Sequence, residues 1–334
     1  MIFTKISSKI KEMKLHIPNS AFLGNINTFL SRLDLSDNGI LDITINKSWI
    51  SIHPLVISMI AALGKQFRPE SIKCEKVLAR SGHYLVRMGL FNFLGIKSEA
   101  PVIEEHEPSG RIIPLTLIKN SSDLKDFLDN LVPLLHLQNE SKNVQAIQHI
   151  FSELIRNVLE HSQSGQGAIV CAQYFKKSNK ISIGVADIGI GLKKSLSQSY
   201  SVQDDREAIK LALTPGVTGT TKKPGGSPQN AGFGLFLIKS IAHVNSDFFV
   251  IISGNKMYKL LQRGKANLEL KGNPFDDRHS IMDIETWKGT AVGVDISINQ
   301  TQEFNNLLRA IHKFYSHEVK GQKKEHYKKP KFIS

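Results

Sequence analysis

The most regular hydrophobic pattern in the sequence lies between Val144 and Ser162. Ile147, Phe151, Leu154 and Val158 recur at the spacing of one buried face of a helix. We therefore predict a helix over this stretch and take it as the element around which the second half of the chain is organised.

The same helix carries a second, polar series. Glu153, Asn157 and His161 recur at four-residue steps, so they share one face. Glu153 can act as a general base on water or a hydroxyl, Asn157 offers an amide oxygen to magnesium beside phosphates, and His161 can hydrogen-bond or position a neighbour. On this helix alone, the alternative of a solvated edge of an ordinary amphipathic helix stays open.

The first hundred residues alternate strand-like and helix-like patterns. Ile40–Ile45 and Lys76–Ala79 are predicted strands, whereas Leu55–Leu63 and Gly82–Leu94 are predicted helices. This order predicts a small α/β domain in which helices back a sheet.

The second half continues with strands and helices after a stretch at 97–112 that is rich in Pro, Ser, Gly and acids, which is typical of a linker. Predicted strands are Ile113–Leu117, Ala168–Phe175, Lys180–Ala186, Phe248–Ser253, Lys256–Leu260 and Thr290–Ile298, and predicted helices are Asp123–Leu137 (capped by Ser121 or Ser122), 203–215 and 235–244. The expected fold is α/β in two domains: residues 1–100, a linker at 101–114, residues 115–300, and a basic tail at 301–334. For residues 115–300 we expect a two-layer α/β sandwich in which helices back a mixed sheet.

Composition agrees with such a protein. A chain of 334 residues can bury two cores, and its 41% hydrophobic and 22% charged content is that of a globular protein. The longest apolar run, Leu55–Leu63, is too short to span a bilayer, and the N-terminus shows no secretory pattern. Cys74 and Cys171 fit no metal or redox spacing. We therefore expect a cytoplasmic protein with no membrane partner.

The formal net charge of +13 favours acidic partners such as nucleotide phosphates or nucleic acid. Part of this charge lies in a cluster of lysines at 320–331, and only two aromatic residues that could stack on bases, Tyr327 and Phe332, accompany it. A solvated, disordered tail is the simpler interpretation, and nucleic-acid binding is the alternative.

A possible base pocket follows the predicted strand 180–186. A single carboxylate, Asp187, can accept a hydrogen bond from an exocyclic amine such as adenine N6, while Gly189 and Gly191 allow close approach of the backbone. Gly289 and Thr290 place a hydroxyl that can join a water network with Asp187.

A possible phosphate site follows further along. Gly232 and Gly234 lie where a loop becomes a helix, so backbone amides and the helix N-terminus can bind phosphate oxygens. The preceding segment, Thr214–Asn230, resembles a lid. It supplies hydroxyls and positive charge through Thr218, Thr220, Thr221, Lys222 and Lys223.

The order of these elements, ELIRN with a following histidine, then DIGIGL, the lid-like loop, GFGLFLI and KGTAV, resembles the GHKL ATPase superfamily over about residues 115–298. The resemblance implies ATP and Mg²⁺ as cofactors and Glu153 as the general base. The residues it implies for ATP are Asn157 (also the magnesium ligand), His161, Asp187, Gly189, Gly191, Leu192, Thr218, Lys222, Gly232, Phe233, Gly234, Leu235 and Thr290.

The Glu-x-x-x-Asn-x-x-x-His form is most similar to the anti-sigma-factor serine kinases, and the first hundred residues resemble a STAS domain. STAS partners are phosphorylated on a serine in a tight turn. The matching turn here is 50–54, which contains Ser51 but lacks the acidic-Ser-Ser-Gly signature. The resemblance therefore implies a docking or regulatory role for this region rather than a phosphoacceptor.

The sequence also differs from several members of the GHKL superfamily. Asn230 stands where a third glycine is usual, too little chain follows Ile298 for a gyrase-type transducer domain, and no helical pair with a phosphoacceptor histidine precedes the ATPase-like region. His312 and His317 lack the cysteine pair of a zinc finger.

The function expected from this resemblance is a regulator that binds Mg-ATP and hydrolyses it or phosphorylates a protein Ser or Thr. It would act on a protein partner, and homodimerisation is open because relatives dimerise. The alternative is a non-catalytic ATP-gated switch, with nucleic acid bound through the basic tail.

Overall fold

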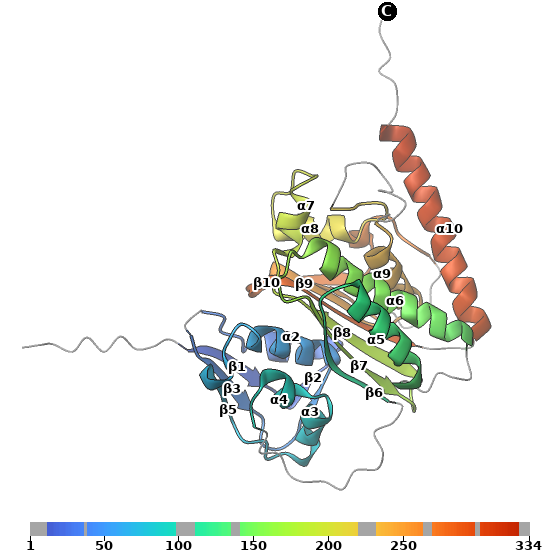
Figure 1. Ribbon diagram of the computed structural model, residues 1–334. Coiled ribbons are helices and arrows are strands. Elements are labelled where there is room, and N and C mark those ends of the chain that lie inside the picture. Colours follow the sequence, from blue (N-terminus) through green and yellow to red (C-terminus); the bar gives the residue numbers. More distant parts are fainter. Residues whose placement is uncertain are drawn as a thin grey trace, which may run out of the picture.

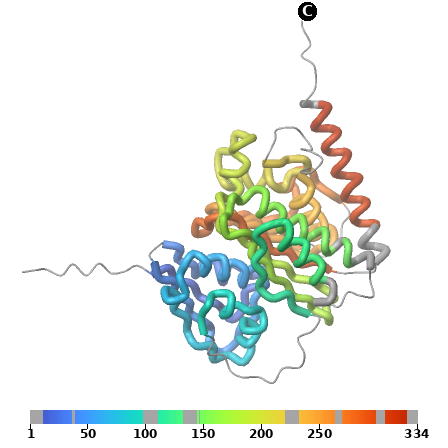
Figure 2. Tube along the Cα trace, in the orientation of Figure 1, coloured from blue at the N-terminus to red at the C-terminus, as the bar shows by residue number. Residues whose placement is uncertain are grey.

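The structure, a computed structural model, describes residues 12–36, 39–97, 111–134, 141–219, 232–262, 269–297 and 301–326. It is a mixed α/β protein, and within those residues its strands form sheets of five, three and two strands. Figure 1 shows the N-terminal part (residues 12–97) packed beside the larger C-terminal part (residues 111–326), and the tube in Figure 2 follows the same chain course.

The N-terminal part contains β1 (Met13–Ile17), β2 (Ser20–Ala21), α1 (Asn27–Leu30), β3 (Leu41–Ile45), β4 (Ser51–Ile52), α2 (Pro54–Gly64), β5 (Ile72–Cys74), α3 (His83–Arg87) and α4 (Leu90–Leu94). The C-terminal part contains β6 (Ile112–Ile118), α5 (Ser121–Leu134), α6 (Ser141–His161), β7 (Ala168–Phe175), β8 (Lys180–Ala186), α7 (Gly191–Leu196), α8 (Asp205–Ala212), α9 (Gly234–Val244), β9 (Phe249–Leu260), β10 (His279–Ser297) and α10 (Thr301–His326).

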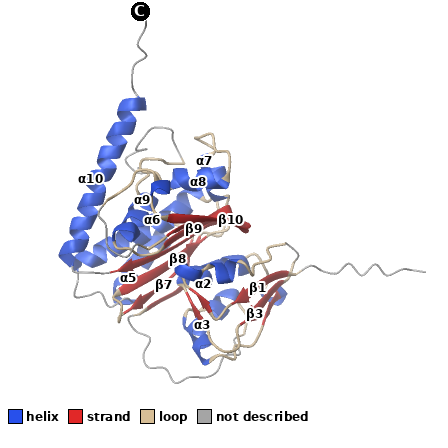
Figure 3. Ribbon diagram, turned by 180° about the vertical axis from the view of Figure 1, so that it is seen from behind, coloured by secondary structure: helices blue, strands red, loops and turns tan. Residues whose placement is uncertain are grey.

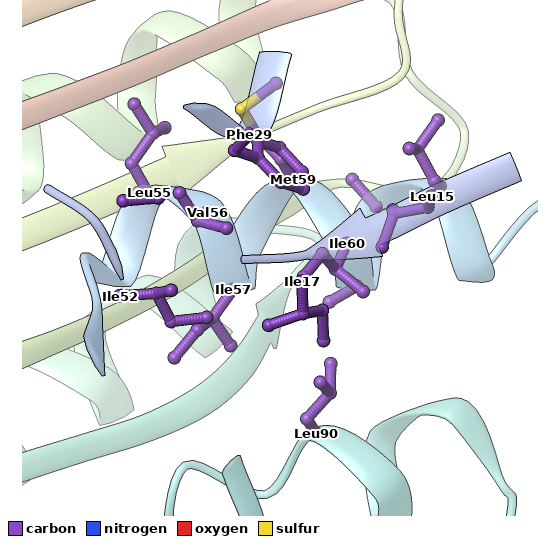
Figure 4. Close-up of a cluster of buried hydrophobic side chains, with 14 of the residues drawn as sticks. Leu15, Ile17, Phe29, Ile52, Leu55, Val56, Ile57, Met59, Ile60 and Leu90 are labelled. Atoms are coloured by element: carbon purple, nitrogen blue, oxygen red, sulfur yellow. The ribbon is translucent and has the colours of Figure 1, made fainter. Parts of the chain in front are cut away.

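Helix α2 is the centre of the N-terminal part. Its start is fixed by Pro54 in the first turn and by His53, whose Nδ1 accepts a hydrogen bond of 3.0 Å from the Leu55 amide. All of its residues are buried, because β1, β3 and β5 form a parallel sheet on one side of it and the large sheet covers the other side. The side chains of α2 interdigitate with those of β1, α1 and α4 (Figure 4).

Two expectations for this region are wrong. The third strand lies at Ile72–Cys74, not at Lys76–Ala79, because Glu75 ends the ladder: its carboxylate accepts the Ile45 amide at 2.8 Å, in place of a further strand carbonyl. The single helix expected over Gly82–Leu94 is divided into α3 and α4 by Gly89, which has a φ of 76°.

The large sheet has the order β6-β7-β8-β10-β9, and all four of its pairings are antiparallel. The mixed sheet expected for residues 115–300 is therefore wrong. A short connection joins β7 to β8, and neighbours joined in this way run in opposite directions. Strands β9 and β10 are also longer than expected, since β9 continues through Gly254 and β10 begins at His279.

One face of the large sheet carries α5, α6 and α9, whose apolar residues share a core with Val170, Ile183 and Val294. Figures 1 and 3 show these helices on the same side of the sheet, with α10 outside them. The cap of α5 is Asn120 rather than Ser121 or Ser122, because the Asn120 side chain accepts the amides of Ser122 and Asp123 at 2.8 and 3.0 Å.

The opposite face of the sheet is covered by α2. A row of small residues, Cys171, Gly184 and Gly293, is aligned across β7, β8 and β10. A Cβ added at Gly184 would lie 2.2 Å from the Leu55 nitrogen, so the glycine is needed for the helix to approach this closely. The Ser58 hydroxyl then donates to the Gly184 carbonyl at 3.0 Å. One hydrophobic core therefore joins the N-terminal part to the sheet.

A buried polar cluster lies at this contact. The carboxylate of Asp295 accepts a hydrogen bond of 2.5 Å from Ser182 and lies 3.4 Å from Nε2 of His53. Burial raises the pKa of Asp295, but its interactions with His53, Ser182 and Lys180 outweigh that effect, and the pKa falls below its ordinary value. The cluster therefore favours an ionised carboxylate between the two parts.

The C-terminal segment differs from the disordered tail expected. Residues Thr301–His326 form α10, whose buried Leu307, Ile311 and Val319 recur along one side. Residues 327–334 lie outside the described chain. No described helix combines the length and apolar character that crossing a membrane requires.

Candidate functional site

A pocket of about 810 Å³, its open mouth included, lies between α6, α7, the start of α9 and the inner ends of β8 and β10. It is lined by Leu154, Asn157, Val158, His161, Ser162, Val185, Asp187, Gly191, Leu192, Ser195, Leu196, Ala212, Val217, Thr218, Gly219, Gly232, Gly234, Leu235, Thr290 and Val292. Ten of the residues proposed from the sequence are among these: Asn157, His161, Asp187, Gly191, Leu192, Thr218, Gly232, Gly234, Leu235 and Thr290.

Asp187 is the buried carboxylate of this pocket, and only 2% of it is exposed. Its two oxygens accept backbone hydrogen bonds from Gly189 at 2.7 Å and from Thr290 at 3.2 Å. Burial raises the pKa of Asp187 to about 7, although both hydrogen bonds act to lower it. A carboxylate has more acceptor positions than these two donors occupy, so it can accept a further hydrogen bond from a ligand.

Glycines make this turn possible. A Cβ at Gly189 would lie 2.1 Å from the Ser162 carbonyl oxygen, and one at Gly289, where φ is 92°, would lie 2.3 Å from the Asp187 carbonyl oxygen. Gly189 does not line the pocket itself. Its role in the structure is to let the turn after β8 pass close to the end of α6.

Two residues that support this turn were not identified from the sequence. The buried hydroxyl of Ser253 accepts the Leu192 amide at 2.9 Å and donates to the Gly289 carbonyl at 2.8 Å. The indole of Trp287 donates to the Asp187 carbonyl at 3.2 Å. Neither residue stands in a motif, because the irregular stretch of β10 that places Trp287 here depends on register shifts against β9.

Trp287 also connects the pocket with the N-terminal part. Its side chain is 1% exposed and belongs to the core that contains α2 and β1, and Ile188 packs against the same core. The turn 187–190 thus has Asp187 on the pocket side and Ile188 on the side of the N-terminal part.

The polar face of α6 meets the start of α9. Asn157 and His161 line the pocket, whereas Glu153 does not. A Cβ at Gly234 would lie 2.4 Å from Oε2 of Glu153 and 3.3 Å from Nδ2 of Asn157, so both side chains reach the first residue of α9. Nδ2 of Asn157 is buried and has no hydrogen-bond partner among the described residues.

The N-terminus of α9 is suited to an anion. Its first turn contains no acidic residue, and the residue that precedes it, Phe233, supplies no side-chain cap. The first amides of a helix lack partners within the helix, and they attract negative charge. Gly232 precedes them with a φ of 68°, and a Cβ there would lie 2.3 Å from the Val217 carbonyl oxygen. This end of the pocket can therefore receive phosphate oxygens.

Phe233 does not line the pocket, in contrast to the ATP contact that the resemblance implies. Its ring lies 4.3 Å from that of His312 and 4.8 Å from that of Tyr315, so it packs on α10. Thr218 and Gly219 bring the start of the lid-like segment to the pocket. Lys222 lies outside the described residues, as do Thr220, Thr221, Lys223 and Asn230.

The described residues contain no group of three or more His, Cys, Asp or Glu side chains that could hold a metal ion. A divalent cation at this site would need oxygen ligands from a bound nucleotide in addition to Asn157. In comparisons with known proteins, neither a family model nor a curated protein matches the chain.

Proposed function

We propose that the chain binds an adenine nucleotide with Mg²⁺ in this pocket, as a GHKL-type ATPase or kinase domain. The observation that supports this most directly is that Asp187 and Asn157 line one and the same cavity. A purine acceptor and a candidate magnesium ligand therefore face the same volume from opposite elements.

The buried carboxylate supplies base recognition. Asp187 would accept a hydrogen bond from the exocyclic amine of adenine, which guanine replaces by a carbonyl at the matching position. Since two backbone amides already fix the orientation of Asp187, a base without this donor would leave a remaining acceptor position of the buried carboxylate without a partner. Such a mismatch costs about 1–3 kcal/mol, so ATP should be favoured over GTP.

The opposite end supplies the phosphate and metal contacts. Amides of the first turn of α9 would bind phosphate oxygens, and Asn157 would contribute its amide oxygen to Mg²⁺. Nδ2 of Asn157 is buried and unpaired among the described residues, and such donors normally have an acceptor, so it supports a phosphate oxygen rather than the metal itself at this position. Bound Mg²⁺ would neutralise phosphate charge and polarise the terminal phosphate.

Glu153 is the proposed general base. It lies one helical turn before Asn157, beside the first residue of α9, so it can take a proton from a water or hydroxyl near the terminal phosphate. With water as nucleophile the reaction is ATP hydrolysis, and with a protein Ser or Thr it is phosphoryl transfer. The N-terminal part would dock the protein partner, as the STAS-like resemblance implies.

Binding can be tested by calorimetry with ATP and GTP, each with and without Mg²⁺. We expect magnesium-dependent ATP binding, a preference of about tenfold or more over GTP, and loss of binding in Asp187→Asn. Equal affinity for both nucleotides, or unchanged binding in Asp187→Asn, would exclude the proposed base pocket.

The reaction is tested with labelled ATP. Glu153→Ala should retain binding and lose phosphate release or phosphorylation of a partner, and Glu160→Ala, on an exposed part of α6, serves as the matched control. Normal turnover by Glu153→Ala would show that the base is a different residue.

The second candidate is a non-catalytic switch. Since Thr218 of the lid-like segment Thr214–Asn230 lines the pocket, bound nucleotide would contact this segment and create a partner surface. ATP binding without phosphate release or phosphoryl transfer would favour this function over the enzyme.

A further inference from the structure

Helix α10 has an outward face that no other part of the described structure covers. Arg309, Lys313, Lys320 and Lys324 are all exposed, and at 100° per residue they lie within about 60° of one another around the helix axis. None of them forms an ion pair within the described chain. Their positive charges are therefore available to a partner.

Between positions 306 and 324, the acidic residue and the buried apolar residues of α10 face inward. Among positions 306–324 the one acid is Glu318, and a Cβ at Gly272 would lie 2.4 Å from its Oε2, which places this carboxylate against the body of the protein. The apolar residues Leu307, Ile311 and Val319 are buried. The outward face is thus cationic and has no large apolar side chain.

We propose that this basic face of α10 binds the phosphate backbone of a nucleic acid. From Arg309 to Lys324 the face extends about 22 Å at 1.5 Å per residue, and a duplex presents one phosphate charge for about every 1.7 Å of its axis. A rigid row of cations therefore meets a regular row of anions. The contacts would be independent of base sequence, because they reach phosphates only.

The composition of the face argues against other acidic partners. Protein interfaces depend on aromatic and apolar anchors at their centre, and helices that lie on membranes insert an apolar face into the lipid. The apolar face of α10 is already used by α6 and α9. Figures 1 and 3 show α10 at the outside of the molecule, with its C-terminal turns extending past the rest, so a long polymer can reach it.

The test uses the full chain and fluorescence anisotropy with a labelled 20-base-pair DNA duplex and a single-stranded RNA of similar charge. For four phosphate contacts with the duplex, log K should fall with log salt at a slope of about −3.6, which is roughly a 150-fold loss between 50 and 200 mM. The two probes show which form of nucleic acid is preferred, and binding of either supports the proposal.

The decisive variant combines Arg309→Gln, Lys313→Gln, Lys320→Gln and Lys324→Gln. The matched control, Lys47→Gln with Lys97→Gln, Lys176→Gln and Lys177→Gln, removes the same charge from exposed positions away from α10. We expect the α10 variant to bind at least 100-fold more weakly at 50 mM salt and the control to stay within about threefold of the unmodified protein. Circular dichroism should show an unchanged total helix content in both variants.

Three results would overturn the proposal. They are failure of the unmodified chain to bind either nucleic acid at 50 mM salt, an equal loss in both quadruple variants, and α10-dependent binding to phosphatidylglycerol vesicles without binding to nucleic acid. None of these outcomes depends on whether the pocket binds ATP.

Discussion

Trp287 provides the sharpest test of how the N-terminal part and the pocket are connected. Its indole N–H donates to the main-chain carbonyl of Asp187 at 3.2 Å, and its ring is buried in the core around α2. Trp287→Phe keeps an aromatic ring in this core but removes the donor. The Asp187 carbonyl then loses a buried hydrogen bond beside the carboxylate proposed to hold adenine.

The expected magnitude follows from two contributions. An unpaired buried acceptor costs about 1–3 kcal/mol, and the volume lost from a close-packed core adds about 1 kcal/mol or more. We expect the free energy of unfolding to fall by about 2–4 kcal/mol. If the loosened 187–190 turn weakens the free energy of ATP binding by about 1.4 kcal/mol, the affinity for ATP falls about tenfold.

The matched control is Phe29→Leu. Phe29 is fully buried in the same core, but its side chain has no donor that could bind the Asp187 carbonyl. Urea unfolding and calorimetry at low temperature separate the two effects. Both variants should lose stability, whereas only Trp287→Phe should lose ATP affinity.

Fluorescence gives an independent measurement. The chain has two tryptophans, and Trp49 is 59% exposed, so Trp49→Phe leaves Trp287 as the only indole. Nucleotide should change its emission. Unchanged ATP affinity in Trp287→Phe, or an equal loss in Phe29→Leu, would refute the reasoning that Trp287 positions the Asp187 turn.

Two further predictions concern packing and pH. Gly184→Ala places a Cβ 2.2 Å from the Leu55 nitrogen, so urea unfolding should show that the free energy of unfolding falls by about 3 kcal/mol or more. The control Gly165→Ala has open space around it and should change this free energy little. Similar values for both variants would contradict the close approach of α2. Because burial raises the pKa of Asp187 from 3.8 to about 7, the folded chain holds this proton more tightly than the unfolded chain, and stability falls as pH rises through that window. Relative to Asp187→Asn, the unmodified protein should lose up to about 4 kcal/mol between pH 4 and pH 7.5, and parallel stability curves for the two proteins would contradict the raised pKa.

Local patterns predicted much of the second half of the chain. The strands at Ala168–Phe175 and Lys180–Ala186 are confirmed, because a short hairpin leaves their hydrophobic pattern to decide the register. The helix around Leu154 is confirmed for the same kind of reason: its apolar and polar residues recur at helical spacing. Spacing therefore showed that Asn157 and His161 share one helix face, whereas their position beside Asp187 in one pocket depends on the fold.

Features that depend on distant contacts could not be predicted. Glu75 ends a strand by accepting an amide thirty residues away, and Trp287 reaches Asp187 only because β10 shifts its register against β9. The packing of the Phe233 ring on α10 could not be predicted, because it depends on the helix at Thr301–His326. The apolar positions of this helix are followed by many lysines, and this composition favours a tail rather than a packed helix.

The close approach of α2 to Gly184 and Gly293 has a consequence for how the protein can be divided. Expression of residues 111–334 alone would leave Ile169, Val250 and Ile252 facing water on a sheet surface shaped to receive a helix. We expect such a fragment to aggregate, and to regain solubility when residues 1–97 are supplied on a separate chain. The boundary between the two domains expected from the sequence is thus not a boundary between two parts that can each fold alone.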